Sequence, residues 1–288
     1  MSPVKNKWLA PKSGRGRVSP RPPRKLRART IEKMWAEHSG GFGAFMSSIE
    51  RDGIAYLSHT KVSTVQRCRQ CYYEQFVLKK KAVGPAIETG TLVHEAAQVA
   101  YQHIQAGRPV DFDALAQKTA ARHSVPSCRA LVGNAITTLS QHLWTGHEIV
   151  GIEEPFFLDL SADLPPVIGV VDLILRDGPR YLVVDHKTSK RFNDEDEGQL
   201  VLYAEYIRQR YGAKRCEGVF DQYRMVPNLA RVRTPVHMRK SVKISAKRTD
   251  ALVPQYRSAW KTMQSIRSAG DAPRGDDCWF CFVPRDKY

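Results

Sequence analysis

The sequence predicts an α/β protein with a small mixed sheet flanked by helices and a helical N-terminal part. Two observations support this class. Apolar residues recur at helical spacing in the first half of the chain, up to residue 144. From residue 151 onward, β-branched and aromatic segments alternate roughly between apolar and polar residues, and helical patterns follow them. The 288 residues, 42% of them hydrophobic, can bury one large core or two small ones, and the order of segments favours one domain over residues 31–288.

The clearest helix prediction covers residues 88–107. This segment combines strong helix formers with apolar residues at helical spacing, and Gly107 ends it. The last helical pattern contains Pro254, which predicts a break or a kink because proline lacks an amide hydrogen for the helix ladder. The other helical patterns cover residues 30–38, 63–81, 114–121, 128–144, 197–212 and 244–270.

Three strands are expected in close succession. The pair Asp177-Gly178 predicts a tight turn between the second and the third strand, which makes these two strands neighbours in the sheet. Two further strands are expected after the helix that follows them. The strand segments cover residues 151–160, 167–178, 180–187, 216–226 and 231–238.

The charge of the chain is strongly positive. It contains 45 Lys and Arg against 29 Asp and Glu, a formal net charge of +16, which favours a polyanionic partner and nucleic acid before a membrane surface. Residues 1–30 carry ten basic residues and no acid, together with five prolines. We therefore expect a flexible basic arm there, with a solubilising tail as the alternative.

The location of the protein is predicted from what the sequence lacks. No apolar run is long enough for a transmembrane helix, and the N-terminus has no apolar segment of the signal-peptide type. We expect a cytoplasmic protein, while a nuclear or organellar address remains open. Without a secretory signal, the six cysteines are not expected to form disulfides.

Two acids and a lysine suggest a catalytic metal centre. Asp172 lies inside an otherwise apolar strand, where a lone carboxylate is expensive to bury. Asp185 lies on the neighbouring strand, and Lys187, two positions on, projects to the same face. Paired carboxylates repel each other unless a divalent cation lies between them, and hard oxygen ligands favour Mg²⁺ or Mn²⁺. The alternative for Asp185 and Lys187 is a surface ion pair at a strand end.

Five sequence blocks in this order resemble the PD-(D/E)XK nuclease superfamily, in the form found in RecB-type exonucleases. The blocks are Gly90-x-x-x-His94, Glu153-Glu154-Pro155-Phe156, Gly169-x-x-Asp172, Asp185-x-Lys187-Thr188 and Gln199-x-x-x-Tyr203. The resemblance implies a restriction-endonuclease-like core at about residues 85–225.

The resemblance also implies roles for the matching residues. His94, Asp172 and Asp185 would hold the metal, together with the backbone carbonyl of His186. Lys187 would be the catalytic lysine. Glu153 would be an outer ligand or a base for water, with Glu154 as its substitute, and Gln199 and Tyr203 would contact the lysine or DNA. For His94, Gln199 and Tyr203, ordinary structural roles remain the alternative.

Four cysteines form two Cys-x-x-Cys pairs, at residues 68–71 and 278–281. This pattern is typical of a four-thiolate metal site, which would join segments 63–75 and 276–284. The pairs, Cys68 with Cys71 and Cys278 with Cys281, resemble the [4Fe–4S] sites of AddB-like and CRISPR-associated nucleases. The usual division is one cysteine before the core and three after it, and here it is two and two. Structural Zn²⁺ is therefore the alternative, and Cys128 and Cys216 are expected to be buried apolar residues.

Together these features predict a Mg²⁺- or Mn²⁺-dependent DNA nuclease. We expect an exonuclease that acts on single strands or DNA ends in recombination, repair or phage replication. A helicase or recombination partner is compatible with this prediction, since the sequence has no GxxxxGK[ST] motor motif of its own. One alternative is a non-cleaving DNA-binding subunit that retains the fold, and another is a zinc-stabilised RNA-binding module.

Overall fold

The computed structural model describes residues 23–80, 84–273, 275 and 278. Residues 1–22 of the predicted basic arm and the predicted ligand Cys281 lie outside the described residues. The chain forms two compact units. Unit 1 contains the N-terminal part up to residue 82, residues 155–169 and the chain from residue 249 onward, and unit 2 contains residues 83–154 and 170–248.

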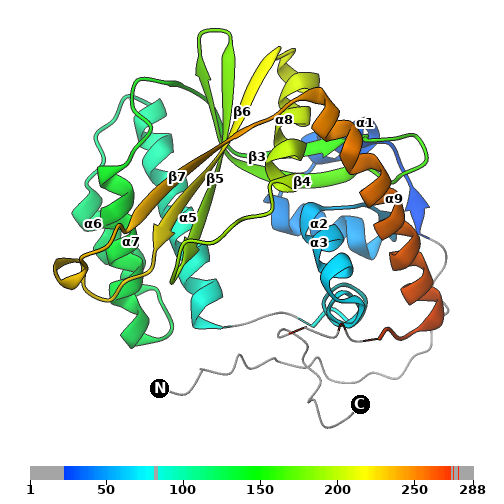
Figure 1. Cartoon of the computed structure of the whole chain (residues 1–288), viewed down its shortest axis with the longest axis horizontal. Helices are drawn as coiled ribbons and strands as arrows, with labels where there is room; N and C mark the ends of the chain where they lie inside the picture. Colours follow the sequence, from blue (N-terminus) through cyan, green and yellow to red (C-terminus); the bar gives the residue numbers. More distant parts are fainter. Residues whose placement is uncertain (1–22, 81–83, 274, 276–277, 279–288) are drawn as a thin grey trace. The chain divides into compact units, whose positions relative to one another are not determined.

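A five-stranded mixed sheet lies mostly in unit 2, with the order β3-β4-β5-β6-β7 (Figure 1). β4 and β5 are antiparallel, β5 and β6 are parallel, and β6 and β7 are antiparallel. The parallel pair requires a crossover connection, which α8 supplies. The strands are β3 (Glu148–Leu158), β4 (Val167–Asp177), β5 (Arg180–Ser189), β6 (Arg215–Arg224) and β7 (His237–Lys243), and the last residues of β3 and the first of β4 belong to unit 1.

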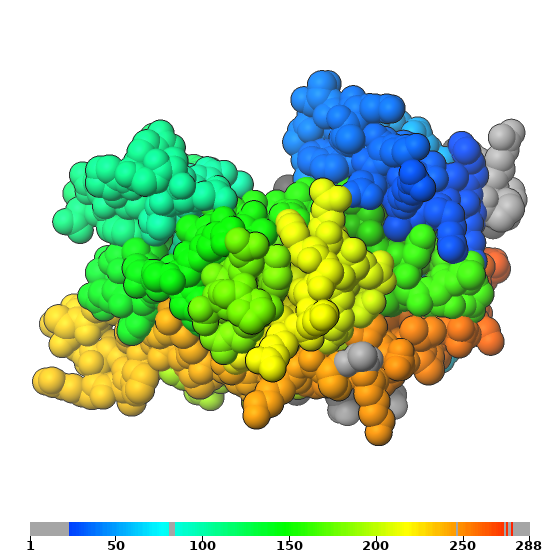
Figure 2. All heavy atoms as spheres, turned by 90° about the horizontal axis from the view of Figure 1, so that it is seen from above, coloured from blue at the N-terminus to red at the C-terminus, as the bar shows by residue number. Residues whose placement is uncertain are grey.

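Helices cover both faces of this sheet. On one face, Ala97 and Tyr101 of α5 and Leu139 of α7 form a core with apolar strand residues such as Val219. On the other face α8 packs so closely that a Cβ at Gly218 would lie 2.8 Å from the Leu200 Cβ. α6 packs on α5 and α7 and lies at the surface (Figure 2, teal). The helices of unit 2 are α5 (Pro85–Gln105), α6 (Phe112–Ala121), the short η2 (Pro126–Cys128), α7 (Arg129–Gln141), α8 (Gly198–Tyr211) and the short η3 (Leu229–Arg231).

Unit 1 is mainly helical. Its core includes Ile31 of α1, Phe45 and Ile49 of α2, and Ile168 of β4. Short β1 and β2 pair in parallel beside these helices. The elements are β1 (Arg24–Lys25), α1 (Ala28–Ala36), α2 (Phe42–Arg51), β2 (Ile54–Ala55), α3 (His59–Arg67), α4 (Arg69–Tyr72), the π-helical η1 (Tyr73–Val77) and most of α9 (Ala246–Ala269).

The predicted fold class is confirmed, and three local predictions need correction. The helix expected over residues 63–81 is interrupted at Cys68, whose backbone is extended, and it continues as α4 and η1. The strand expected over residues 231–238 starts only at His237, after Pro235, which cannot donate to a sheet ladder. α9 runs through Pro254, so the break that was one of the two expected effects of this proline is absent.

Two further findings concern the burial of Cys128 and Cys216 and the search for membrane-spanning helices. Cys216 is buried as expected, whereas Cys128 is only half-buried, because it lies in the short η2 turn rather than inside a helix. Within the described part of the chain, no helix is both long and apolar enough to cross a membrane.

Candidate active site

The β4–β5 hairpin brings the two predicted acids together. Leu173 pairs with Val184, so Asp172 and Asp185 are the next residues along the two strands. The Asp172 Oδ2 accepts a hydrogen bond of 2.9 Å from the backbone amide of His186. The tight turn expected from Asp177-Gly178 is present, with Gly178 at a φ of +56° that suits glycine. The hairpin register therefore positions the carboxylates without help from distant elements.

Lys187 is held beside Asp185 by α8. The Lys187 Nζ lies 2.6 Å from the Asp185 Oδ2 and donates to the Gln199 Oε1 at 3.1 Å. The Gln199 Nε2 donates to the Asp185 Oδ1 at 2.8 Å and to the Tyr203 hydroxyl at 2.6 Å. Gln199 and Tyr203 lie one turn apart on α8, so the two side chains can contact each other. Four of the predicted residues thus form one connected group.

A second group contains His94 of α5 and Glu153 of β3. Potential ligand atoms of His94, Glu153 and Asp172 all lie within 4.8 Å of one another, and the His94 Nδ1 is 3.4 Å from the Asp172 Oδ2. Asp185, a predicted ligand, is 1% exposed and is paired with Lys187. The structure therefore places Glu153 with His94 and Asp172, while Asp185 belongs to the lysine group.

The backbone favours Glu153 over Glu154 for this position. Glu153 has a φ of +48°, which is uncommon for a residue with a side chain and is typical of a strained functional position. Glu154 instead accepts hydrogen bonds from the hydroxyls of Tyr206 and Tyr211, at 2.5 and 2.8 Å. The substitute role considered for Glu154 is therefore not supported by its contacts.

A cavity of about 390 Å³ lies beside His94 and Glu153. α5 comes close to β5 here, since a Cβ at Gly90 would lie 3.1 Å from the Thr188 Oγ1. The glycine in the Gly90-x-x-x-His94 block thus permits the helix to bring His94 to the strands. The cavity is lined by Gly90, Thr91, His94, Glu95, Gln98 and Glu153.

The electrostatics of the site fit a bound cation. Burial and the nearby Asp172 and Asp185 raise the pKa of Glu153 to about 7. Burial also raises the pKa of Asp185, although Lys187 opposes this shift. Burial alone would lower the pKa of Lys187, but the carboxylate of Asp185 outweighs burial and raises it. The raised pKa values of these two carboxyl groups show that their negative charges are poorly compensated in the site. A divalent cation bound between them would stabilise the charged forms.

His186 has its backbone at the site and its side chain on the other face of the sheet. Its amide contacts Asp172, whereas its buried ring stacks on Tyr101, with centroids 5.8 Å apart. Burial lowers the pKa of this imidazole to about 4. The predicted contribution of His186 through its backbone carbonyl is compatible with this orientation.

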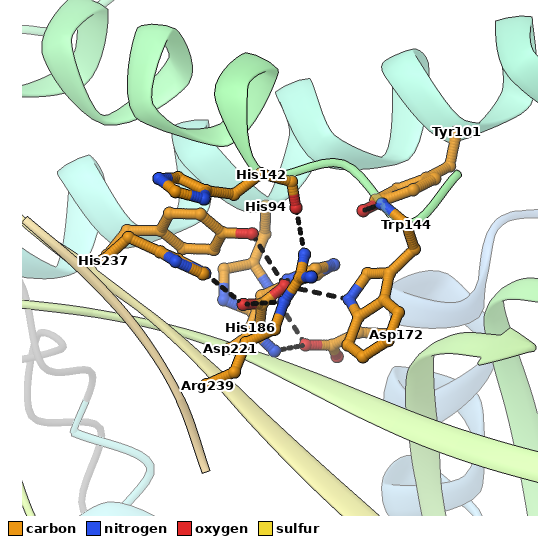
Figure 3. A network of polar contacts seen from close by, with 10 residues as sticks. His94, Tyr101, His142, Trp144, Asp172, His186, Asp221, His237 and Arg239 are labelled. Carbon is orange, nitrogen blue, oxygen red and sulfur yellow. Dashed lines mark hydrogen bonds and ion pairs between the residues drawn. The ribbon is translucent and has the colours of Figure 1, made fainter. Parts of the chain in front are cut away.

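Asp221 of β6, which was not among the predicted site residues, is the centre of a buried polar network on that other face (Figure 3). Its carboxylate accepts hydrogen bonds from the side chains of Trp144, Tyr223, His237 and Arg239, at 2.5 to 3.2 Å. The signal was present in the sequence. Asp221 is an acid inside an apolar strand, as Asp172 is.

Three of the four predicted thiolates meet in unit 1. The Sγ atoms of Cys68, Cys71 and Cys278 lie within 4.8 Å of one another, and all three residues are buried. The Cys68 Sγ accepts hydrogen bonds from the backbone amides of Cys71 and Gly275. This buried thiol cluster is chemically suited to a thiolate-bound metal, and the fourth predicted ligand, Cys281, is outside the described residues.

A family model of the PD-(D/E)XK nuclease superfamily matches residues 56–284. The fold is similar to the crystal structure of a candidate exonuclease from Eubacterium rectale, with 10% identity, a TM-score of 0.48 and coverage of 78% of this chain and 86% of that one. It is also similar to a protein designated SSO0001, with 9% identity, a TM-score of 0.35 and coverage of 91% and 95%. No curated protein matches the sequence significantly.

Proposed function

Because the chain belongs to the PD-(D/E)XK nuclease superfamily, we propose that this nuclease is a Mg²⁺- or Mn²⁺-dependent deoxyribonuclease, acting as an exonuclease on single strands or DNA ends. The observation that carries the proposal is the meeting of Asp172, Asp185 and Lys187 on one hairpin. The positive charge of the chain supports a nucleic-acid substrate.

His94, Asp172 and Asp185 would hold the divalent cation, together with the backbone carbonyl of His186, and Glu153 lies close enough to His94 and Asp172 to join them as an outer ligand. Their oxygen-rich donor set favours Mg²⁺ or Mn²⁺ over zinc. When bound, such an ion supplies Lewis acidity at the scissile phosphate and makes a nearby water more acidic.

Lys187 would act on the attacking water and on the negative charge that develops on the phosphate. Its ammonium is fixed by Asp185 and by Gln199, so it needs little reorganisation during the reaction. Tyr203 would act through Gln199, because its hydroxyl accepts a hydrogen bond from the Gln199 amide. These two residues of α8 are therefore positioning residues.

Glu153 would be either an outer ligand or the base that accepts a proton from water. A carboxylate whose pKa is about 7 can accept a proton and release it again near neutral pH. Its strained backbone and its proximity to His94 support a functional role rather than a packing role.

Cys68, Cys71, Cys278 and Cys281 would bind a [4Fe–4S] cluster, with structural Zn²⁺ as the alternative. The buried cluster of three described thiols supports a metal, and the choice of a cluster depends on resemblance alone. The biological setting we propose is recombination, repair or phage replication in a bacterial or phage-infected cell, with a helicase or recombination partner.

The test is a cleavage assay with end-labelled single-stranded DNA, duplex DNA and RNA, each with Mg²⁺ or with EDTA. We expect Mg²⁺-dependent loss of label from DNA, and blocked 5′ and 3′ ends would reveal whether cleavage starts at an end. Tight DNA binding without any cleavage would instead identify a non-cleaving subunit, and cleavage of RNA alone would contradict the proposed substrate.

A further inference from the structure

Unit 1 contains a cavity of about 220 Å³. None of the three cysteines of the thiol cluster lines this cavity. It is small compared with the roughly 300 to 1,000 Å³ of pockets that enclose drug-sized ligands. Its walls combine aromatic rings with cations. The charged and aromatic lining residues are Glu50, Tyr56, Lys61, Tyr72, Phe76, Lys79, Trp260 and Arg267.

Lys61 of α3 is the most unusual of these residues. It is only 4% exposed, and its Nζ lies 3.1 Å from the centroid of the Tyr56 ring. Within the part of the chain that the structure describes, no carboxylate forms an ion pair with it. Burial lowers the pKa of this amine well below its usual value. An ammonium that is buried against the Tyr56 and Phe76 rings, with no carboxylate paired to it, is costly to charge, and a bound anion would offset this cost.

The single acid of the cavity does not neutralise Lys61. Glu50 accepts a hydrogen bond of 2.7 Å from the Tyr56 hydroxyl and forms an ion pair of 2.5 Å with Lys79. The second uncompensated cation is Arg267 of α9, whose Nε is buried and has no hydrogen-bond partner among the described residues. The cavity thus has two cations that lack a negative partner.

We propose that this cavity binds a phosphate group, and specifically the terminal phosphate of a nucleic-acid strand. A doubly charged phosphate matches two unpaired cations, and the small volume fits a strand end better than a whole nucleotide. The strand-end source rests on the proposed function, whereas phosphate binding itself does not.

The experiment measures binding of labelled single-stranded oligonucleotides by fluorescence anisotropy in EDTA, which prevents cleavage. Oligonucleotides with a 5′-phosphate, a 3′-phosphate or hydroxyl ends are compared on the full chain. We expect one phosphorylated end to bind about 10- to 100-fold more tightly than hydroxyl ends, the range for hydrogen bonds to a charged group.

Three variants give the comparison its controls. Lys61→Met retains the apolar stem and should remove the preference for the phosphorylated end, while binding to hydroxyl ends changes less than about twofold. Arg267→Gln tests the second cation in case Lys61→Met fails to fold, which thermal melting reports. Lys33→Met removes an exposed lysine of α1 that does not line the cavity, and it should retain the preference.

Equal affinity of the wild-type chain for all three oligonucleotides would refute the strand-end proposal, as would an intact preference in folded Lys61→Met and Arg267→Gln. Stabilisation by inorganic phosphate that both variants abolish, without any end preference, would support a phosphate site and refute the strand end as its source. A preference that persists while Mg²⁺-dependent cleavage is absent would refute the proposed catalysis and leave this inference standing.

Discussion

Lys187 differs from an ordinary surface lysine because two partners on different elements fix its ammonium. Asp185 contacts it from the same strand and Gln199 from α8. A fixed charge stabilises a transition state better than a mobile one, since no reorganisation is needed during the reaction. We therefore expect DNA cleavage to depend on Lys187 more strongly than folding does.

Replacing Lys187 by methionine should lower the rate of Mg²⁺-dependent DNA cleavage by at least about 100-fold. The aliphatic stem remains, but the buried Asp185 loses its cationic partner, so the thermal midpoint should fall while the protein stays folded. Single-turnover cleavage of labelled DNA and thermal melting measure the two effects. Lys190→Met, at an exposed position three residues further on, is the matched control and should retain full activity. Cleavage at the wild-type rate by folded Lys187→Met would remove the assignment.

Asp172 and Asp221 show which functional acids the sequence can predict and which it cannot. Both are acids inside apolar strands, and the same physical argument applies to both. Asp172 was identified because a second acid and a lysine follow it on the next strand. The partners of Asp221 come from β6, β7 and the segment after α7, and no spacing in the sequence brings them together.

The network around Asp221 joins β6, β7 and the segment that carries Trp144 (Figure 3). Burial alone would raise the pKa of Asp221, but the hydrogen bond from His237 and the charge of Arg239 outweigh burial and hold the pKa at about 2. A carboxylate with a lowered pKa stabilises the fold above its unfolded pKa, which is near 3.8, and this stabilisation is lost as the pH falls towards 2.

Asp221→Asn should therefore destabilise the protein by about 2 kcal/mol or more at pH 7, and the difference from wild type should shrink between pH 5 and about 2. Urea unfolding of both proteins at several pH values measures this difference. Asp177→Asn, an exposed carboxylate in the β4–β5 turn, serves as the control and should cost less than about 1 kcal/mol. A difference that stays constant with pH would contradict the ionic role of Asp221.

Element boundaries were predictable where a local signal fixed them. Gly107 and Gly212 have positive φ angles and end α5 and α8, as their positions in the sequence indicated. The π-helical η1 and the late start of β7 could not be predicted. η1 follows the extended Cys68, and β7 is fixed by its pairing with β6, so both depend on tertiary contacts.

Gly212→Ala should destabilise the protein by about 1 kcal/mol, because the residue has a φ of +64° and an added Cβ is strained there. Gly133→Ala should have the opposite effect. Gly133 lies inside α7, and its Cβ would meet only ordinary contact at 4.0 Å, so the helix should gain up to about 1 kcal/mol. Urea unfolding of the two variants measures both signs, and destabilisation by Gly133→Ala would show that crowding of the added methyl group outweighs the gain in helix propensity.

In unit 1, residues that are far apart in the sequence lie side by side. Cys71 and Cys278 are 207 residues apart in sequence, and their Sγ atoms are 3.2 Å apart. The Cys-x-x-Cys spacing allowed this meeting to be predicted, since a shared metal is the common reason for two such pairs. The cavity around Lys61 has no comparable signal, because its lining residues come from segments without a recognisable motif.

A metal bound by the thiol cluster would join two distant segments of unit 1 and would make the stability of this unit depend on each thiolate. Cys71→Ser should remove metal from the purified protein and lower the free energy of unfolding by several kcal/mol, because metal binding to thiolate sites contributes about 10–16 kcal/mol to folding. Metal analysis, visible absorption and thermal melting of anaerobically purified protein measure these changes.

Cys128→Ser, at a half-buried cysteine outside the thiol cluster, should change none of them. Iron with visible absorption supports the cluster, one zinc per colourless chain supports the structural alternative, and equal stability of metal-free Cys71→Ser and wild type would show that the thiols pack together without a metal.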